Sequence, residues 1–199
     1  MRKTYFDYYG KYAAETPDKV LLRIDENTLT YREFMEMTAR LGSGMQKLGI
    51  KPNDKVGIIM PNSIEWYLVY WAAIRIGAQP VPMDPQSGSL ELSRLIPATT
   101  VKICFLAERY RNNRIIDAVS ALVPGQLSQD KCICFAPQEA LPADPVFITE
   151  DTFLRDYCGM ECAPFTPEPE HTMSLACTSG STGTPKVLAV PYEGFLISQ

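Results

Sequence analysis

Apolar and polar positions along this chain predict a regular succession of strands and helices. Residues 20–24 and 28–30 are expected to form two short strands around a polar turn, and residues 55–60 a buried strand. Between them, apolar side chains recur at the spacing of one helix face; they are Phe34, Met37, Leu41, Met45 and Leu48. The polar residues Thr30 and Glu33 fit a capping box at the start of this helix, and Gly49 fits its C-terminal end.

The same alternation continues downstream and defines the fold class. Asn62 and Glu65 are expected to cap a helix that runs to Ile76. The further expected elements are a strand at 79–83, helices at 90–96 and 113–123, strands at 101–106 and 131–135, and a short helix at 151–157. Because Pro80 and Pro82 interrupt the 79–83 strand, we expect it to lie at a sheet edge or to end early. Alternating strands and helices predict an α/β fold with a mainly parallel sheet flanked by helices.

Four aromatic residues gather on the helix that follows Asn62, namely Trp66, Tyr67, Tyr70 and Trp71. They can either line a ligand pocket or pack in the core. Their large apolar surface favours the core.

Composition and charge limit the function classes. With 199 residues, 46% of them hydrophobic, the chain can bury one sizeable core. The net charge is −4, and Arg109, Arg111 and Arg114, the densest basic group, are expected to form a solvated surface. We therefore expect no nucleic-acid partner. No apolar run approaches the roughly 20 residues of a membrane span, and no apolar stretch follows the N-terminal cations as in a signal peptide. A cytoplasmic location is expected.

The six cysteines and the single histidine are expected to be structural. Cys104, Cys132, Cys134 and Cys177 lie in strand-like runs, with Cys132 and Cys134 on one side of a strand. Cys158 and Cys162 have a spacing seen in zinc sites but no second pair of turn-borne ligands. Buried free thiols are the favoured interpretation, and we assign no metal ligands. His171 is isolated between proline-rich sequence and a strand.

The run from Thr178 to Lys186, Thr-Ser-Gly-Ser-Thr-Gly-Thr-Pro-Lys, carries the most chemistry. Two glycines let backbone N–H groups approach an anion, the hydroxyls add donors, and the lysine adds a cation. The run leaves the carboxyl end of an expected strand, where ligands bind in parallel sheets. It is not the common P-loop, because Pro185 stands where that motif has its second glycine. A flexible surface turn is the alternative, but such a turn needs neither the Thr-Pro-Lys ending nor flanking strands.

This run resembles the phosphate-binding signature of the adenylate-forming (AMP-binding) enzymes, which include acyl-CoA ligases, peptide-synthetase adenylation domains and luciferases. Residues 29–34, residues 56–62 with Glu65, and residues 77–85 also match the family's N-terminal pattern in order and spacing. Two positions depart from it. Val187 replaces the glycine that usually follows the loop lysine, and Tyr192 stands where some members have a histidine.

The resemblance implies a two-step reaction. A carboxylic acid attacks the α-phosphate of ATP, accompanied by Mg²⁺, and a thiol, usually that of coenzyme A, then displaces AMP to give a thioester. The residues implied in binding the β- and γ-phosphates are Thr178, Ser179, Gly180, Ser181, Thr182, Gly183, Thr184 and Lys186. The hydroxyls would donate, the glycines would let backbone amides approach, and Lys186 would offset phosphate charge.

The resemblance also implies that residues 1–199 form the N-terminal part of a longer ligase domain, with a candidate sub-boundary near 136–170. The family's adenine motif, ribose-binding aspartate and lid domain with its catalytic lysine lie downstream of the matching region. We therefore expect no catalytic residue within this chain and no turnover by it alone. The alternatives are a fragment of a peptide-synthetase adenylation domain, a non-catalytic phosphate-binding module, and a phosphotransferase with an unusual loop. The acid and the oligomeric state are not predicted.

Overall fold

The computed structural model describes residues 4–122, 132–135, 137, 141, 147–168, 170–178 and 186–192. The helices are α1 (Tyr5–Glu15), α2 (Tyr31–Lys47), α3 (Ile64–Arg75), α4 (Ser89–Thr99), α5 (Ile115–Ser120) and α6 (Glu150–Asp156). The strands are β1 (Val20–Ile24), β2 (Asn27–Thr30), β3 (Lys55–Ile59), β4 (Gln79–Pro82), β5 (Val101–Ala107), β6 (Cys132–Phe135), β7 (Ile148–Thr149), β8 (Thr172–Thr178) and β9 (Lys186–Pro191).

The central element is a five-stranded parallel sheet with the strand order β4-β3-β5-β6-β7. After β3 the chain adds β4 on one side and then crosses over to add β5, β6 and β7 on the other. This reversal creates a switch point between β3 and β5, and ligands often bind outside the carboxyl ends of the strands at such a point. The predicted parallel α/β fold is confirmed, and β4 lies at an edge of this sheet as its prolines require.

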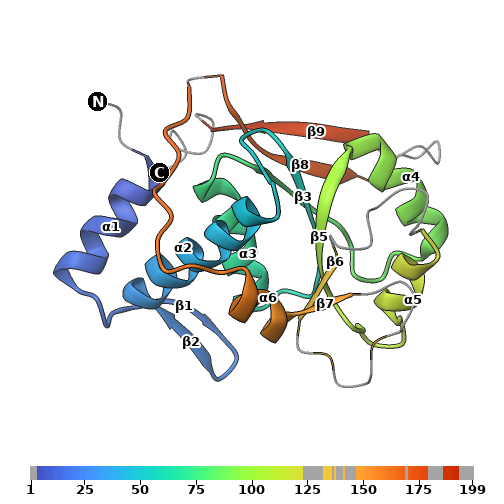
Figure 1. Ribbon diagram of the computed structural model, residues 1–199, viewed down its shortest axis with the longest axis horizontal. Helices are drawn as coiled ribbons and strands as arrows, with labels where there is room; N and C mark the ends of the chain where they lie inside the picture. Colours follow the sequence, from blue (N-terminus) through green and yellow to red (C-terminus); the bar gives the residue numbers. More distant parts are fainter. Residues whose placement is uncertain are drawn as a thin grey trace.

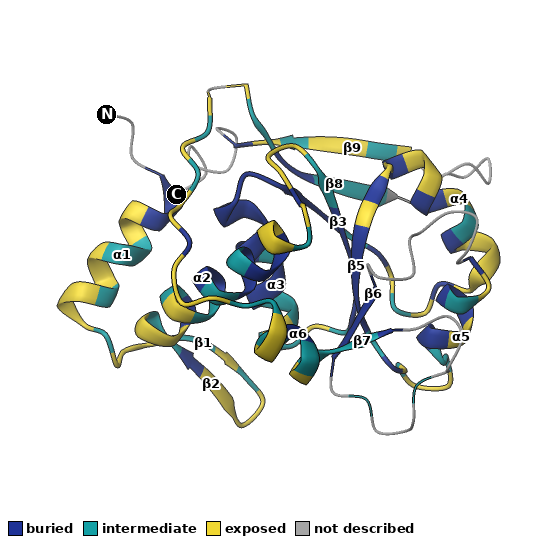
Figure 2. Cartoon of the chain, viewed as in Figure 1, coloured by how far each residue is buried: buried dark blue, intermediate teal, exposed yellow. Residues whose placement is uncertain are grey.

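Helices cover both faces of the sheet (Figure 1). On one face, Ile103 and Phe105 pack in a core with α1, α2, α3 and α6. On the other, Cys104 and Leu106 pack in a core with α4 and α5. Because side chains alternate across a strand, one run of β5 supplies both cores. The central strands are accordingly buried along most of their length, whereas the outer faces of the helices are exposed (Figure 2).

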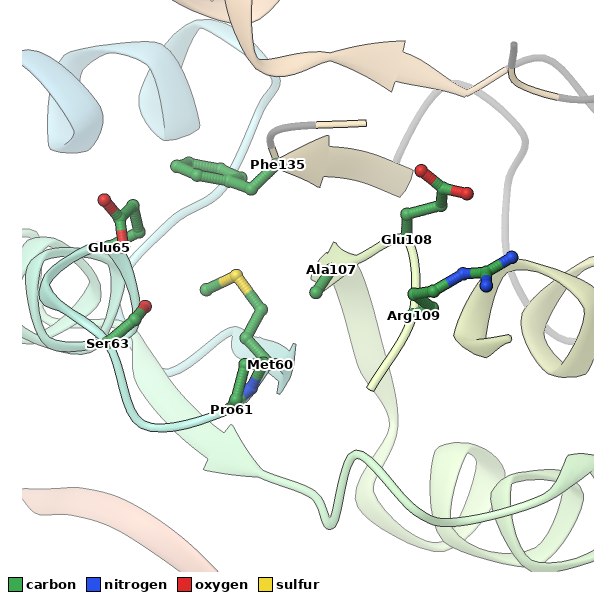
Figure 3. Close-up of a pocket in the computed structure, with 8 residues that line it drawn as sticks. All are labelled: Met60, Pro61, Ser63, Glu65, Ala107, Glu108, Arg109 and Phe135. Carbon is green, nitrogen blue, oxygen red and sulfur yellow. The ribbon is translucent and has the colours of Figure 1, made fainter. Parts of the chain in front are cut away.

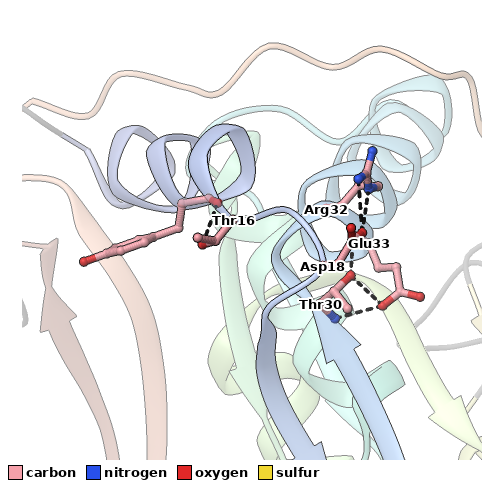
Figure 4. A network of polar contacts seen from close by, with 6 residues as sticks. Thr16, Asp18, Thr30, Arg32 and Glu33 are labelled. Atoms are coloured by element: carbon pink, nitrogen blue, oxygen red, sulfur yellow. Dashed lines mark hydrogen bonds and ion pairs between the residues drawn. The ribbon is translucent and has the colours of Figure 1, made fainter.

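The predicted capping box at the start of α2 is confirmed (Figure 4). The Glu33 N–H donates to the Thr30 hydroxyl at 3.3 Å, and the Thr30 N–H donates to the Glu33 carboxylate at 2.8 Å. Beside it, Arg32 pairs with Asp18 at 3.0 Å on the surface. The helix is followed by Gly49 with φ of +86°, as expected for a glycine at a helix C-terminus.

Several boundaries differ from the sequence predictions. Ser63, not Asn62, caps α3, because the Ser63 hydroxyl accepts the Trp66 N–H at 3.1 Å. Helix α5 is shorter than the predicted 113–123, since the Asn113 amide instead donates to the Pro85 carbonyl at 2.8 Å and ties two loops together.

Helix α1 and strand β7 were not predicted. The start of α1 is rich in tyrosine, which has only moderate helix propensity, and the capping box of Thr4 and Asp7 precedes no clear apolar periodicity. Strand β7 has only two residues. Within the described residues, no helix combines the length and the apolar character needed to cross a bilayer.

Candidate functional site

The predicted phosphate loop joins two paired strands. Strands β8 and β9 form an antiparallel hairpin, and Thr178 and Lys186 are cross-strand partners at its loop end. The ends of the nine-residue run are therefore brought together, and Lys186 is exposed. The intervening predicted residues, Ser179, Gly180, Ser181, Thr182, Gly183 and Thr184, lie outside the described residues.

The position of this hairpin corrects one expectation. The run does leave the carboxyl end of a strand, but β8 and β9 form a separate two-stranded sheet and not part of the parallel sheet. Consecutive strands joined by so short a connection must pair antiparallel, because a parallel pair requires a crossover of a dozen or more residues. Strand β8 lies alongside β4, so the hairpin extends the sheet region past its β4 edge (Figure 1).

Side chains of α3 hold the inner face of the hairpin. Ser174 of β8 is buried and shares a hydrogen bond with the Tyr70 hydroxyl. Burial raises the pKa of Tyr70, so its hydroxyl stays protonated near neutral pH. Trp66 stacks on Tyr70 with ring centroids 5.2 Å apart. The Ser174–Tyr70 hydrogen bond thus links the loop-bearing hairpin to α3, and the Trp66–Tyr70 stack lies within α3 itself.

The aromatic group of α3 is only partly a core element. Trp71 is buried, whereas Trp66, Tyr67 and Tyr70 are half-buried and border a cavity of about 650 Å³. Its other walls come from α1, β4 and the hairpin; they are Tyr9, Pro82, Ser174, Leu175, Ala176, Cys177 and Val190. Trp71 lines this cavity as well, and the other three rings also pack against the core, so the core and pocket interpretations both hold in part. Cys177, which directly precedes the predicted phosphate loop, is one of the lining residues.

A second cavity lies at the switch point of the parallel sheet (Figure 3). It has a volume of about 200 Å³ and is bordered by residues that follow β3, begin α3, or end β5 and β6: Met60, Pro61, Ser63, Glu65, Ala107, Glu108, Arg109 and Phe135. Glu108 is buried, and the Arg114 guanidinium lies 3.9 Å from its carboxylate. Sequence reasoning missed this pocket, although the position of these residues just after predicted parallel strands was a usable signal.

Four of the six cysteines are buried as predicted, whereas Cys158 and Cys177 are only half-buried. Cys104, Cys132 and Cys134 are buried free thiols in the core under α4 and α5, as predicted for Cys132 and Cys134 on one strand face. Burial raises the pKa of Cys134 to about 12, which keeps it as an unreactive thiol. Burial lowers the pKa of His171, whose ring lies 5.2 Å from that of Phe165. Among the described residues, no group of three His, Cys, Asp or Glu side chains has the arrangement of a metal site.

Comparison with known proteins identifies the family. The AMP-binding enzyme family model matches residues 10–198. Tyrocidine synthase 3 of Brevibacillus parabrevis is 25% identical over 195 residues, covering 98% of this chain and 3% of that protein. 4-Coumarate–CoA ligase 2 of Petroselinum crispum is 25% identical over 171 residues, covering 86% of this chain and 29% of that protein.

A solved structure agrees with the fold. The anthranilate CoA ligase AuaEII, solved in complex with anthranoyl-AMP, superimposes with a TM-score of 0.83 at 16% identity, covering 98% of this chain and 36% of that chain. The chain spans between 3% and 36% of the length of these three proteins. Because the family model covers nearly all of its residues, this chain belongs to the AMP-binding enzyme family.

Proposed function

We propose that this chain is the N-terminal part of an ATP-dependent acid–thiol ligase. The enzyme would join a carboxylic acid to the AMP moiety of ATP with release of pyrophosphate, and then transfer the acyl group to coenzyme A. The observation that carries the proposal is the pairing of Thr178 with Lys186 at the loop end of the hairpin, which brings together the two ends of a run rich in hydroxyls and glycine. The chain that carries this run belongs to the AMP-binding family.

In this proposal the loop binds the β- and γ-phosphates, which leave as pyrophosphate. Donors aimed at a leaving group are effective because they stabilise charge that develops in the transition state. Ser181, Thr182 and Gly183 would contribute most, with Thr178, Ser179, Gly180 and Thr184 shaping the loop. Lys186, the first residue of β9, is exposed.

The metal and the second substrate belong to the same proposal. Mg²⁺ is usually held by substrate phosphates together with one or two carboxylates. In this proposal ATP would bring most of the ligands. Coenzyme A would act as the thiol that displaces AMP. A cytoplasmic location, a sub-boundary near 136–170 and a lid domain encoded outside residues 1–199 complete the proposal.

A second candidate is the adenylation domain of a peptide synthetase, where the acceptor thiol belongs to a carrier protein. The match that covers 98% of this chain in tyrocidine synthase 3 favours this alternative. The two candidates share the first half-reaction and differ in the acid and in the thiol.

The decisive experiment is ATP–pyrophosphate exchange by the protein that carries this chain, with panels of aliphatic acids, aromatic acids and amino acids. Acid-dependent exchange followed by an acyl-CoA product in mass spectrometry is the expected result. Exchange only with amino acids, and transfer only to a carrier-protein thiol, would replace the first candidate by the second. Exchange with none of the acids would contradict both.

A further inference from the structure

The end of the hairpin opposite the loop is closed by a cluster of rings, which we name the base cluster: Tyr5, Trp71, Phe165, His171 and Tyr192. The ring centroids of Tyr5 and Tyr192 are 5.1 Å apart, and the ring centroids of Tyr5 and Trp71 are 5.3 Å apart. The His171 ring lies 6.5 Å from Tyr192 and 5.2 Å from Phe165. The cluster thus joins α1, α3 and the segment before β8 to the end of β9.

Tyr192 makes the polar link in this cluster. Its hydroxyl accepts the Tyr5 N–H at 3.1 Å, and its own N–H donates to the His171 carbonyl at 3.0 Å. Tyr5 is the first residue of α1, so its N–H is one of the donors that a helix cannot pair internally. Both tyrosines are about 95% buried, with exposed fractions of 5% and 6%. A buried donor without a partner is unfavourable, and therefore this hydrogen bond ties the start of α1 to the end of β9.

The far side of the cluster is fixed to α3. The Phe165 N–H donates to the Arg75 carbonyl at 2.7 Å. Phe165 also packs on Gly77, where φ is +76° and an added Cβ would lie 2.7 Å from the ring. His171 therefore rests on a rigid neighbour, and the hairpin base is held from two directions.

The hairpin can transmit the position of its base to the loop. Strand β9 has six residues, which at the rise of a β-strand corresponds to about 20 Å. A tilt of about 5° at the base would move Lys186 by roughly 2 Å over this length. Displacements of about 1 Å in a catalytic arrangement can lower a rate about 100-fold.

We propose that Tyr192 is a positioning residue, which sets where the hairpin holds Thr178 and Lys186 by joining the end of β9 to the start of α1. Its consequence for nucleotide binding rests on the proposed function, whereas the coupling between α1 and the hairpin does not. Tyr192 itself contacts no phosphate in this proposal and acts only through the strand.

Hydrogen exchange tests the coupling directly. The change is Tyr192→Phe, which keeps the ring and removes the hydroxyl; Tyr12→Phe on the exposed face of α1 is the matched control. We expect amides of residues 186–191 and of the first turn of α1 to exchange at least tenfold faster in Tyr192→Phe, with β3 and β5 unchanged and Tyr12→Phe like the parent. Unchanged exchange in the hairpin, or equal acceleration in the hairpin and the central sheet, would overturn the proposal.

A measurement on the unaltered chain covers the case in which Tyr192→Phe does not fold. If Tyr192 couples the two elements, native-state exchange in low urea should show β9 and the first turn of α1 opening as one unit with one denaturant dependence. Independent opening of the two would refute the coupling.

Binding of MgATP separates this inference from the proposed function. We expect about tenfold weaker binding by Tyr192→Phe and unchanged binding by Leu92→Ala, a variant of α4 that lowers stability in the core on the other face of the sheet. Equal weakening by both variants would mean that Tyr192 is merely structural. The measurement uses the protein that carries this chain; if that protein does not bind MgATP, the proposed function fails, and the exchange result still decides the coupling.

Discussion

Two glycines within helices make a matched test of the packing between α2 and α6. Gly44 of α2 faces α6 and the segment after it: a Cβ added there would lie 2.6 Å from the Cys158 sulfur and 2.6 Å from the Phe153 ring. Gly10 of α1 is also inside a helix, but the nearest heavy atom to its added Cβ is the Met35 methyl at 3.7 Å, an ordinary contact. Replacing each by alanine gives the same gain in helix propensity and differs only in the space available.

The expected magnitudes follow from these distances. Alanine is favoured over glycine inside a helix by about 1 kcal/mol, so Gly10→Ala should raise the free energy of unfolding by up to that amount. At Gly44 the same gain is opposed by overpacking, which costs about 1–3 kcal/mol when the neighbours must move. Phe153 is fully buried and cannot rotate away freely. We therefore expect Gly44→Ala to lower the free energy of unfolding by about 1 kcal/mol, which is the overpacking cost less the gain in helix propensity.

Urea unfolding followed by circular dichroism at 222 nm, a wavelength at which helices dominate the signal, measures both variants against the parent chain. The reasoning is refuted if Gly44→Ala stabilises the protein as much as Gly10→Ala does, because α2 would then not be in close contact with Phe153 and Cys158. Matching urea dependence of the free energy in all three proteins is required for the comparison.

Two further substitutions test the described contacts. Thr30→Ala removes the hydroxyl's part of the capping box and should cost about 1 kcal/mol at pH 7. Hydrogen bonds from the Thr30 backbone N–H, which alanine keeps, and from the Thr30 hydroxyl, which it loses, lower the pKa of Glu33. The hydroxyl's share is present above the unfolded pKa and is lost as pH falls through the folded pKa, so the parent–variant difference in urea titrations should shrink towards pH 3; a difference that stays constant would count against the contact. Arg75→Met removes the buried hydrogen bond from the Arg75 Nε to the Cys162 carbonyl at 2.7 Å and should lower the free energy of unfolding by about 2–3 kcal/mol. The control Arg23→Met, at an exposed position, should lower it little. Equal losses of thermal stability in the two variants would show that Arg75 does not anchor the 162–165 segment.

Much of the fold was predictable because it depends on local patterns. The capping box of Thr30 and Glu33, the glycines that end α2 and α3, and the prolines of β4 each specify a backbone feature that needs no tertiary information. By contrast, helix α1 is stabilised by tertiary packing of Tyr5 and Phe6 on α2 and α3, and the two-residue β7 exists through pairing with β6.

The chemistry of the candidate site stays a prediction, and the location of the site was only partly predictable. The composition of residues 178–186 indicated phosphate binding, and the flanking apolar runs indicated the two strands. The separate antiparallel sheet of these strands, the aromatic pocket beside Cys177 and the switch-point pocket near Arg109 all depend on how distant segments meet. Met60 and Ala107 line one cavity because β3 and β5 are neighbours in the sheet, and a local sequence pattern does not predict the order of strands in a sheet.

The most direct test of the central claim is phosphorus NMR of MgATP, pyrophosphate and AMP titrated with the chain. If the loop between β8 and β9 binds the terminal phosphates, ATP and pyrophosphate signals should broaden and shift while AMP responds far less. The double variant Gly183→Val with Lys186→Ala should abolish the response, and the exposed Lys11→Ala in α1 should preserve it. An equal response to all three ligands, or an undiminished response in the double variant, would contradict the assignment of this loop to the terminal phosphates of ATP.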